Sequence, residues 1–254
     1  MKRHFVYVCL FCNIVAFASL ARSIDISGES MKQLTSRFPF AIVLEGTKEE
    51  SARFLYANIN QNVHLYRLEK GKLKLEWETT NLGSRVTAFF VKDLYHDGSE
   101  ELIIGTAGGR ILIYELEEYE LLWENLQDRF EKVECMTSEN IDLDTQDELI
   151  FIADSFLYIY DSLNKSLEWQ SQGNFRAAEI IVANVDDDEQ PEIILNTGFI
   201  FDSKFYNIEL QTENSFGDRM SLLDINGDGY PEIIGELTNF SLRIFDVYAE
   251  RELW

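Results

Sequence analysis

Cysteine is scarce in this sequence, and disulfide bonds are therefore excluded as the framework of the fold. Of the three cysteines, Cys9 and Cys12 lie close to the N-terminus, and Cys135 is the one thiol in the rest of the chain. One thiol cannot form an internal disulfide, so packing, and metal ions where they bind, must hold the chain together. Cys135 lies in an alternating apolar run, which favours a buried small residue over a nucleophile.

Basic residues are also few. The chain has 22 Lys and Arg against 45 Asp and Glu, which gives a formal net charge of −23. This balance argues against nucleic acid as a partner, because nucleic-acid binding needs a positive surface. The excess of carboxylates is compatible with cation binding, although an acidic surface also keeps a protein soluble.

A long apolar run occurs only at the N-terminus. Two basic residues precede an apolar stretch from Phe5 to Phe17, and small residues follow it. This pattern predicts a secretory signal peptide over 1–21, then a linker over 22–37 and a folded domain over 38–254. The alternative is a short membrane anchor, but the run is short for a bilayer. We expect a secreted, periplasmic or cell-surface protein with no transmembrane segment after signal cleavage.

Helical periodicity of useful length is missing as well, and the chain repeats instead as short strands. Trp77, Trp123 and Trp169 lie 46 residues apart in similar contexts, and Trp254 ends the chain after an interval that holds two units, with Leu210 at the tryptophan position of the first. We interpret these tryptophans as packing residues between neighbouring units rather than as ligand-stacking residues.

Each unit reads as four strands rich in aromatic and β-branched residues, which is the size of a propeller blade. The sequence therefore predicts an all-β fold, a β-propeller of five four-stranded blades; the alternative is part of a seven-bladed ring. The five units cover about 38–80, 84–126, 131–172, 176–213 and 217–254.

A carboxylate-rich loop of nine residues separates the first and second strands of four units. The fullest copy runs from Asp224 to Glu232, with oxygen-bearing side chains at loop positions 1, 3, 5 and 9 and Gly229 at position 6. Ca²⁺ takes six to eight oxygen ligands, which these side chains and a backbone carbonyl at position 7 would supply. Glycine at position 6 permits the left-handed turn that wraps the loop.

The other copies keep this spacing but vary in quality. Glu189 and Thr145 replace the glycine in two loops, Tyr95 takes position 3 in another, and the first unit has no such loop. The predicted metal-ligating residues are Asp224, Asn226, Asp228, Tyr230 and Glu232; Asn184, Asp186, Asp188, Gln190 and Glu192; Asn140, Asp142, Asp144, Gln146 and Glu148; and Asp93, Asp97, Ser99 and Glu101.

Turns rich in Asp and Asn without a metal are the alternative interpretation of these loops. Four copies in register, each ending in an acid before an apolar strand, favour Ca²⁺ instead. The acid stands at position 9 rather than 12, and a strand follows it, so the loops are not EF-hands. This arrangement indicates a structural role, in which the ion fastens a turn and neutralises clustered acids.

On these residues the chain resembles the FG-GAP/VCBS repeat family, whose propellers are related to the integrin α-subunit head. The resemblance is carried by Asp224–Glu232, by the preceding Phe216-Gly217 and by the following Ile233-Ile234-Gly235. It implies a β-propeller with Ca²⁺ in such loops and a non-catalytic role in adhesion, recognition or assembly. Integrin-type propellers have seven blades, whereas five units fit this chain.

A second resemblance is to quinone-cofactor propeller repeats. It is carried by the strand Leu157–Asp161 followed by Leu167-Glu168-Trp169. Such repeats occur in dehydrogenases and in non-catalytic scaffold proteins of the bacterial envelope, so the resemblance implies an alternative scaffold function.

Signals for catalysis are weak. His64 lies in a predicted strand and His96 in an acidic loop, and the calcium interpretation already accounts for the regularly spaced acids. We therefore expect a non-enzymatic module that binds a protein or carbohydrate ligand at a rim of loops, with candidate turns around Tyr119, Asn164 and Tyr248. The alternative is an extracellular carbohydrate-active enzyme or lectin; the enzyme would need catalytic carboxylates about 5–10 Å apart.

Overall fold

The computed structural model describes residues 40–44, 52–69, 72–142 and 144–254. The predicted signal peptide and linker lie outside these residues. All 20 regular elements in the described residues are β-strands. Within the same residues, no helix has the length and hydrophobicity needed to cross a membrane. The chain divides into two compact units, one ending at Leu82 and one beginning at Gly83.

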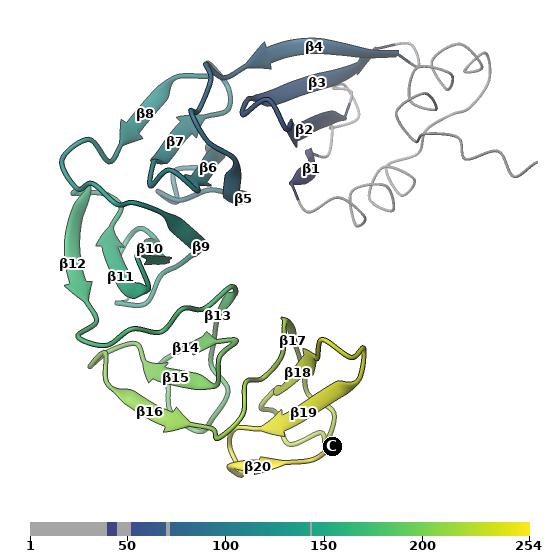
Figure 1. Cartoon of the computed structure of the whole chain (residues 1–254), viewed down its shortest axis with the longest axis vertical. Coiled ribbons are helices and arrows are strands. Elements are labelled where there is room, and N and C mark those ends of the chain that lie inside the picture. Colours follow the sequence, from purple (N-terminus) through teal and green to yellow (C-terminus); the bar gives the residue numbers. More distant parts are fainter. Residues whose placement is uncertain (1–39, 45–51, 70–71, 143) are drawn as a thin grey trace, which may run out of the picture. The chain divides into compact units, whose positions relative to one another are not determined.

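The strands form five antiparallel four-stranded sheets, which we call blades 1 to 5 in chain order (Figure 1). In every blade, strands that follow one another in sequence are neighbours in the sheet. This confirms the predicted all-β fold built from five four-stranded units.

The strand bounds are as follows. Blade 1 comprises β1 (Ala41–Leu44), β2 (Arg53–Ala57), β3 (Val63–Glu69) and β4 (Lys72–Glu78). Blade 2 comprises β5 (Val86–Lys92), β6 (Glu101–Thr106), β7 (Ile111–Glu115) and β8 (Leu121–Glu124). Blade 3 comprises β9 (Val133–Glu139), β10 (Glu148–Ala153), β11 (Phe156–Asp161) and β12 (Ser166–Gln170). Blade 4 comprises β13 (Ile180–Ala183), β14 (Glu192–Leu195), β15 (Phe199–Asp202) and β16 (Ile208–Gln211). Blade 5 comprises β17 (Arg219–Leu223), β18 (Glu232–Glu236), β19 (Leu242–Asp246) and β20 (Arg251–Glu252).

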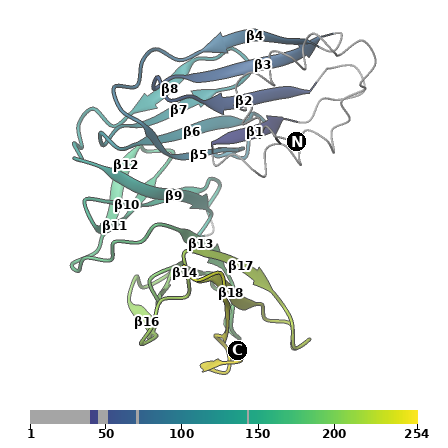
Figure 2. The same cartoon turned by 45° about the vertical axis from the view of Figure 1, so that its right-hand side comes forward.

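Blade 1 makes up the described part of the first unit. Its strands β2, β3 and β4 lie side by side (Figure 2), and Leu55 and Leu65 are fully buried on its apolar face. Arg67 of β3 donates two hydrogen bonds to Glu76 of β4, at 2.7 and 2.6 Å. Part of the β1–β2 connection, where the other blades carry the acidic loop, lies outside the described residues.

The second unit is held together by apolar layers between successive blades. Ile103 and Ile113 of blade 2 share a buried cluster with Phe151 of blade 3. Two further clusters join blade 3 to blade 4 and blade 4 to blade 5. The middle strand β10 is buried along its whole length, because the clusters shared with blades 2 and 4 cover both of its faces. Burial of this apolar surface is the main stabilising contribution to the unit.

A polar residue follows the outer strand in blades 1 to 3. It stands two positions after the repeated tryptophan and is Thr79, Asn125 or Ser171 in blades 1 to 3. Each of these side chains accepts a hydrogen bond from a backbone N–H of the third strand, at 2.9, 2.7 and 3.0 Å. In these three blades, the residue two positions after the tryptophan therefore pairs a backbone N–H group at the end of the sheet.

In blade 5 the Phe216-Gly217 pair approaches the middle of β18 closely. A Cβ atom added to Gly235 would lie 1.7 Å from the backbone oxygen of Phe216, so no larger residue fits there. Phe216 itself is fully buried against Phe245, with ring centroids 5.6 Å apart. This contact explains physically why glycine stands at position 235.

Candidate metal centres

The four predicted acidic loops all occupy the same place in their blades. Each loop connects the first strand to the second, and its position 9 glutamate is the first residue of the second strand. The loops span Asp93–Glu101 in blade 2, Asn140–Glu148 in blade 3, Asn184–Glu192 in blade 4 and Asp224–Glu232 in blade 5.

The position 9 glutamate is buried in all four blades, with 1 % of its surface exposed in each: Glu101, Glu148, Glu192 and Glu232. One carboxylate oxygen of each accepts a hydrogen bond from the backbone N–H of loop position 2, at 2.9, 2.8, 2.8 and 2.7 Å in the same order. This bond orients the carboxylate toward the inside of its own loop. A buried acid with one oxygen held in place is unusual without a further partner.

Backbone hydrogen bonds curl the rest of each loop around that acid. In blades 3 to 5, the side chain at position 3 accepts the N–H of position 5, at 3.0, 3.0 and 2.8 Å. In all four loops the position 5 aspartate accepts the N–H of position 7, at 2.6–2.9 Å. Gly98 and Gly229 at position 6 have φ angles of +94° and +99°, the left-handed conformation expected for glycine. The replacements Thr145 and Glu189 do not adopt a positive φ.

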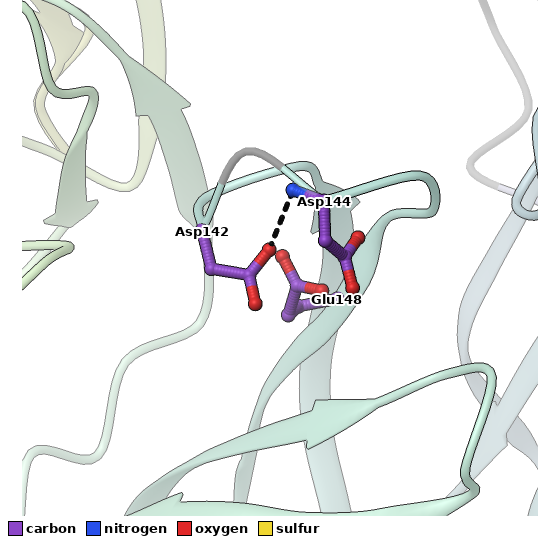
Figure 3. A group of neighbouring side chains, drawn as sticks. All are labelled: Asp142, Asp144 and Glu148. Atoms are coloured by element: carbon purple, nitrogen blue, oxygen red, sulfur yellow. Dashed lines mark hydrogen bonds between the residues drawn. The ribbon is translucent and has the colours of Figure 1, made fainter.

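In blade 3 the carboxylates of Asp142, Asp144 and Glu148 point toward one another (Figure 3). An oxygen from each lies within 4.8 Å of the others. Asn140 and Gln146 donate side-chain N–H groups to the backbone oxygen and to the carboxylate of Asp144, respectively. The structure thus brings together three of the five predicted ligands of this loop.

In blade 4 the cluster differs from the prediction. Asp186 and Glu192 meet Glu209 of β16, with the three ligand oxygens within 4.8 Å of one another. Asp188 does not join this group of three, but it binds the backbone N–H of Gln190. Glu209 was not predicted from the sequence, because it lies on the outer strand, far from the loop along the chain.

In blade 5 the predicted Asp228 and Glu232 are joined by Asp246, the last residue of β19, again within 4.8 Å. The amide nitrogen of Asn226 donates to both Asp228 and Glu232, at 2.9 and 2.5 Å, and so lies between two carboxylates. Asp224 accepts the N–H groups of two loop residues, at 2.6 and 3.1 Å. An acid ends the third strand of blades 2 to 5, and that repeated acid was the sequence signal that could have identified Asp246.

Asp246 also provides a test of whether a cation fits. The residue is 3 % exposed, and its Oδ2 atom accepts no hydrogen bond among the described residues. Arg251 Nε lies 3.5 Å from that oxygen, at the long end of an ion pair. A buried carboxylate oxygen without a hydrogen bond is costly, and a divalent cation would satisfy it.

Blade 2 does not assemble a comparable group among the residues that the structure describes. Asp93 accepts the N–H groups of Asp97 and Gly98, at 3.1 and 3.0 Å, and these hydrogen bonds hold the turn. Tyr95, at ligand position 3, packs its ring against the apolar cluster between blades 2 and 3. Burial, with Glu101 and Asp97 nearby, raises the pKa of Tyr95 to about 12.

Three of these buried glutamates hold their protons more tightly than ordinary carboxyls. Burial, together with neighbouring loop aspartates, raises the pKa of Glu101 and of Glu148 to about 7 and that of Glu192 to about 8. Partial loss of hydration at the exposed Glu209, together with Asp186, likewise raises its pKa to about 7. A bound cation would favour the charged form of every one of these groups, so proton and metal compete for the same oxygens.

An ion-pair cluster that the sequence did not indicate links the loops of blades 2 and 3. Asp147, at loop position 8, is 1 % exposed and pairs with both Lys92 and His96 of blade 2, the latter at 2.7 Å. Lys92 also donates to Glu139 at 3.0 Å. Burial opposes the charge of Lys92, but its bonds to Asp147 and Glu139 outweigh this effect and raise the pKa of its ammonium group.

The residues predicted for a ligand-binding rim lie in the turns between the third and fourth strands. Tyr119 adopts a φ of +62°, and Asn164 donates its backbone N–H to Asp161 at 2.8 Å. Tyr248 packs against Tyr230 of the blade 5 loop, with ring centroids 4.9 Å apart. Trp123 and Trp169 pack against the apolar clusters between blades, which agrees with their predicted packing role.

No family model and no curated protein matches this sequence. Solved structures do match. BBS1N, crystallised in complex with ARL6DN, has a TM-score of 0.58 and 13% identity over 85% of this chain and 67% of that chain. Sqt1 of Saccharomyces cerevisiae has a TM-score of 0.58 and 12% identity over 84% of this chain and 61% of its own. The V. cholerae biofilm matrix protein Bap1 has a TM-score of 0.59 and 16% identity over 85% of this chain and 38% of its own.

At these identities the likeness shows the fold alone. It assigns the five blades to the β-propeller class. The chain spans less than two thirds of the lengths of Sqt1 and Bap1.

Proposed function

We propose that this protein is a calcium-binding propeller of the FG-GAP/VCBS type, which acts outside the cytoplasm as a non-catalytic module for recognition or assembly. Ca²⁺ is assigned to blades 3, 4 and 5. In blade 2 the tyrosine at position 3 leaves a turn held by hydrogen bonds.

One observation carries the calcium assignment. In three blades, a glutamate buried at the base of a loop meets two further carboxylates within 4.8 Å. Three carboxylates so close together repel one another unless they bind protons or a cation. Carboxylate and amide oxygens are the ligands that Ca²⁺ prefers, and loop backbone and water would complete the six to eight that it needs.

The ion would act on structure rather than on a substrate. It would neutralise the loop acids and fasten the first strand of a blade to the second, and in blades 4 and 5 also to an outer strand through Glu209 or Asp246. Because such ions bind the folded loop and not the open chain, their binding free energy adds to the stability of the blade.

The chemical state of the other reactive groups supports a non-catalytic role. Burial raises the pKa of the Cys135 thiol to about 12, so it is a poor nucleophile. His96 is paired with Asp147, and His64 lies 3.2 Å from Glu78 and 3.0 Å from the Tyr66 hydroxyl. The recurring acids belong to loops in register, which suits repeated structural sites better than one catalytic pair.

The proposed location and partners have separate support. Secretion rests on the N-terminal sequence pattern, which lies outside the described residues. A protein partner agrees with the fold, because BBS1N was crystallised in complex with ARL6DN. A carbohydrate ligand is the alternative partner.

Thermal unfolding in EDTA and in CaCl₂ tests the calcium assignment. At a free Ca²⁺ concentration 100 times the Kd, each site adds about 2.7 kcal/mol, and in a chain of this size each kcal/mol raises the Tm by about 2–4 °C. Asp228→Asn with Asp246→Asn keeps acceptor oxygens but removes two charges, so part of the calcium-dependent rise in Tm should disappear. Asp218→Asn, at an exposed residue of the same blade, is the matched control. Identical melting curves in EDTA and CaCl₂ would refute the assignment.

A further inference from the structure

Two successive junctions between blades of the second unit are built from equivalent residues. Each junction uses the tryptophan of one blade's outer strand and two residues of the next blade. In that next blade, an acid ends the third strand. The two residues are the aromatic residue just before this acid and the residue four positions after it. These residues are Trp123, Tyr160 and Lys165 at the junction of blades 2 and 3, and Trp169, Phe201 and Tyr206 at the junction of blades 3 and 4.

At the first junction the chain fills this space with its own lysine. The rings of Trp123 and Tyr160 lie 6.2 Å apart. Lys165 lines the space between the two blades, and its ammonium group donates to the backbone oxygen of Leu122 at 3.4 Å. No room for a water molecule remains there.

At the second junction the corresponding space is open. A groove of about 340 Å³ lies there, within the size range of small-ligand sites. Phe175 and Phe201 are buried in the blade 3–4 cluster beneath it, 9 % and 2 % exposed. Trp169 and Tyr206 are half-buried, with ring centroids 5.2 Å apart, and Ile208 is 45 % exposed. We call this space the Trp169 groove.

The charge beside the groove differs from that at the neighbouring junction. Tyr206 stands where the first junction has Lys165, and Glu168 stands where it has Leu122. Glu168 accepts the hydrogen bond of the Tyr206 hydroxyl at 2.5 Å. No lysine or arginine lines the groove. Compared with the first junction, the second therefore has an aromatic ring in place of the lysine, and the carboxylate that accepts from this ring's hydroxyl lies beside the groove.

The surroundings of Tyr206 add to this negative character. Burial is the largest cause that raises the pKa of its hydroxyl, and Glu168, Glu148 and Asp142 contribute to the same rise. Calcium in blade 3 would neutralise the loop acids Glu148 and Asp142. Glu168 is not a member of that cluster, so its charge at the groove remains when metal is bound.

We propose that the Trp169 groove binds the arginine or lysine side chain of a basic segment in a partner protein. Rings of Trp and Tyr attract a cation placed over their faces, and Glu168 would pair with its charge. The apolar floor would take the aliphatic part of the side chain, as Lys165 shows at the neighbouring junction. This proposal rests on the recognition role proposed above and names the chemistry of the partner.

Fluorine NMR of the protein labelled with 5-fluorotryptophan tests the groove directly. The resonance of Trp169 is assigned from Trp169→Leu, a change for which Leu210 is the precedent at the same position of blade 4. The probe is a Gly-Ser decapeptide with one central arginine, titrated in CaCl₂, and the matched peptide carries neutral citrulline. We expect the Trp169 signal to shift and that of Trp123 to stay, with the arginine peptide binding about 5–30-fold more tightly than the citrulline peptide.

Variants and outcomes complete the test. Glu168→Gln keeps an acceptor for Tyr206 and should weaken arginine binding about threefold or more, and Trp169→Leu about fivefold or more. Trp123→Leu is the control and should leave binding unchanged. Equal binding of both peptides, or a Trp169 signal that shifts only with a neutral oligosaccharide, overturns the proposal. If the Trp169 signal does not shift with the arginine peptide while Ca²⁺ still raises the Tm, the proposed binding at the groove is refuted and the calcium assignment is retained.

Discussion

Raising the pH from 5 to 8 without Ca²⁺ should destabilise this protein. In the folded chain the pKa values of Glu101, Glu148 and Glu192 are raised from 4.5 to about 7, 7 and 8. A carboxyl group whose pKa is higher in the folded than in the unfolded chain binds its proton more tightly when folded. Its contribution to stability is complete below the pKa of the unfolded chain and is lost as the pH rises through the pKa of the folded chain. The stabilisation is therefore lost between about pH 4.5 and about pH 8.

The magnitude follows from the size of these changes. A change of one in pKa corresponds to about 1.4 kcal/mol, so a rise from 4.5 to about 7 corresponds to at most about 3.4 kcal/mol, and the rise of Glu192 to about 8 to at most about 4.8 kcal/mol. The neighbouring Asp142 and Asp144 are exposed, and solvent screens their repulsion. We expect about 1 kcal/mol per loop, or about 3 kcal/mol in total, which lowers the Tm by roughly 6–12 °C.

Calcium should reverse the trend. Ca²⁺ binds the deprotonated carboxylates, so its stabilising effect grows as the pH rises from 5 to 8. The Tm difference between CaCl₂ and EDTA should therefore be small at pH 5 and largest at pH 8.

Circular dichroism melts at pH 5, 6, 7 and 8, each in EDTA and in CaCl₂, measure both trends. Glu148→Gln with Glu192→Gln keeps an acceptor for the loop N–H groups and removes the titrating protons, so the slope in EDTA should flatten. Glu134→Gln, in β9 of blade 3 and outside the acidic loop, is a control that should keep the slope. A Tm in EDTA that rises between pH 5 and pH 8, or a double variant with an unchanged slope, would refute the reasoning.

Three further predictions concern packing and ion pairs. Lys92→Met leaves Asp147 buried with one fewer charged partner, and chemical unfolding should show a loss of about 2–4 kcal/mol. Gly235→Ala places a methyl group against the backbone oxygen of Phe216 and should cost about 3 kcal/mol or more by the same measurement. Cys135 should resist iodoacetamide in the native protein, as mass spectrometry of its peptide would show, because its thiol is buried and its pKa is raised to about 12.

Each of these has a matched comparison. Lys132→Met removes an exposed lysine 3.5 Å from Glu134 and should change stability by less than about 0.5 kcal/mol. A Cβ at Gly173 would meet Phe175 at an ordinary 3.4 Å, so Gly173→Ala should be tolerated. The cysteine should react readily once the chain is unfolded in guanidinium. Two results would contradict the structure. One is that Cys135 reacts with iodoacetamide as fast in the native as in the unfolded protein. The other is that each variant loses no more unfolding free energy than its matched comparison.

The strand repeat and the loop motif could be read from the sequence, because both are local patterns. Alternating apolar residues place one face of a strand toward the core, and Trp77, Trp123 and Trp169 mark the phase of the repeat. The spacing of acids at loop positions 1, 3, 5 and 9 likewise follows from how one short segment curls. The predicted blades and the positions of their loops were therefore confirmed, while calcium itself stays a prediction.

Tertiary structure decided which groups meet across segments. Glu209 and Asp246 reach the loops of blades 4 and 5 from outer or third strands, and Lys92 reaches Asp147 from the neighbouring blade. Burial of Glu192, which raises its pKa, also depends on the sheets packed around it. The contrast between a junction filled by a lysine and an open groove depends on how two blades pack. Such contacts join residues far apart in the chain. The acid repeated at the end of the third strand can mark Asp246 as a candidate, but only the folded arrangement of the blades brings such residues together.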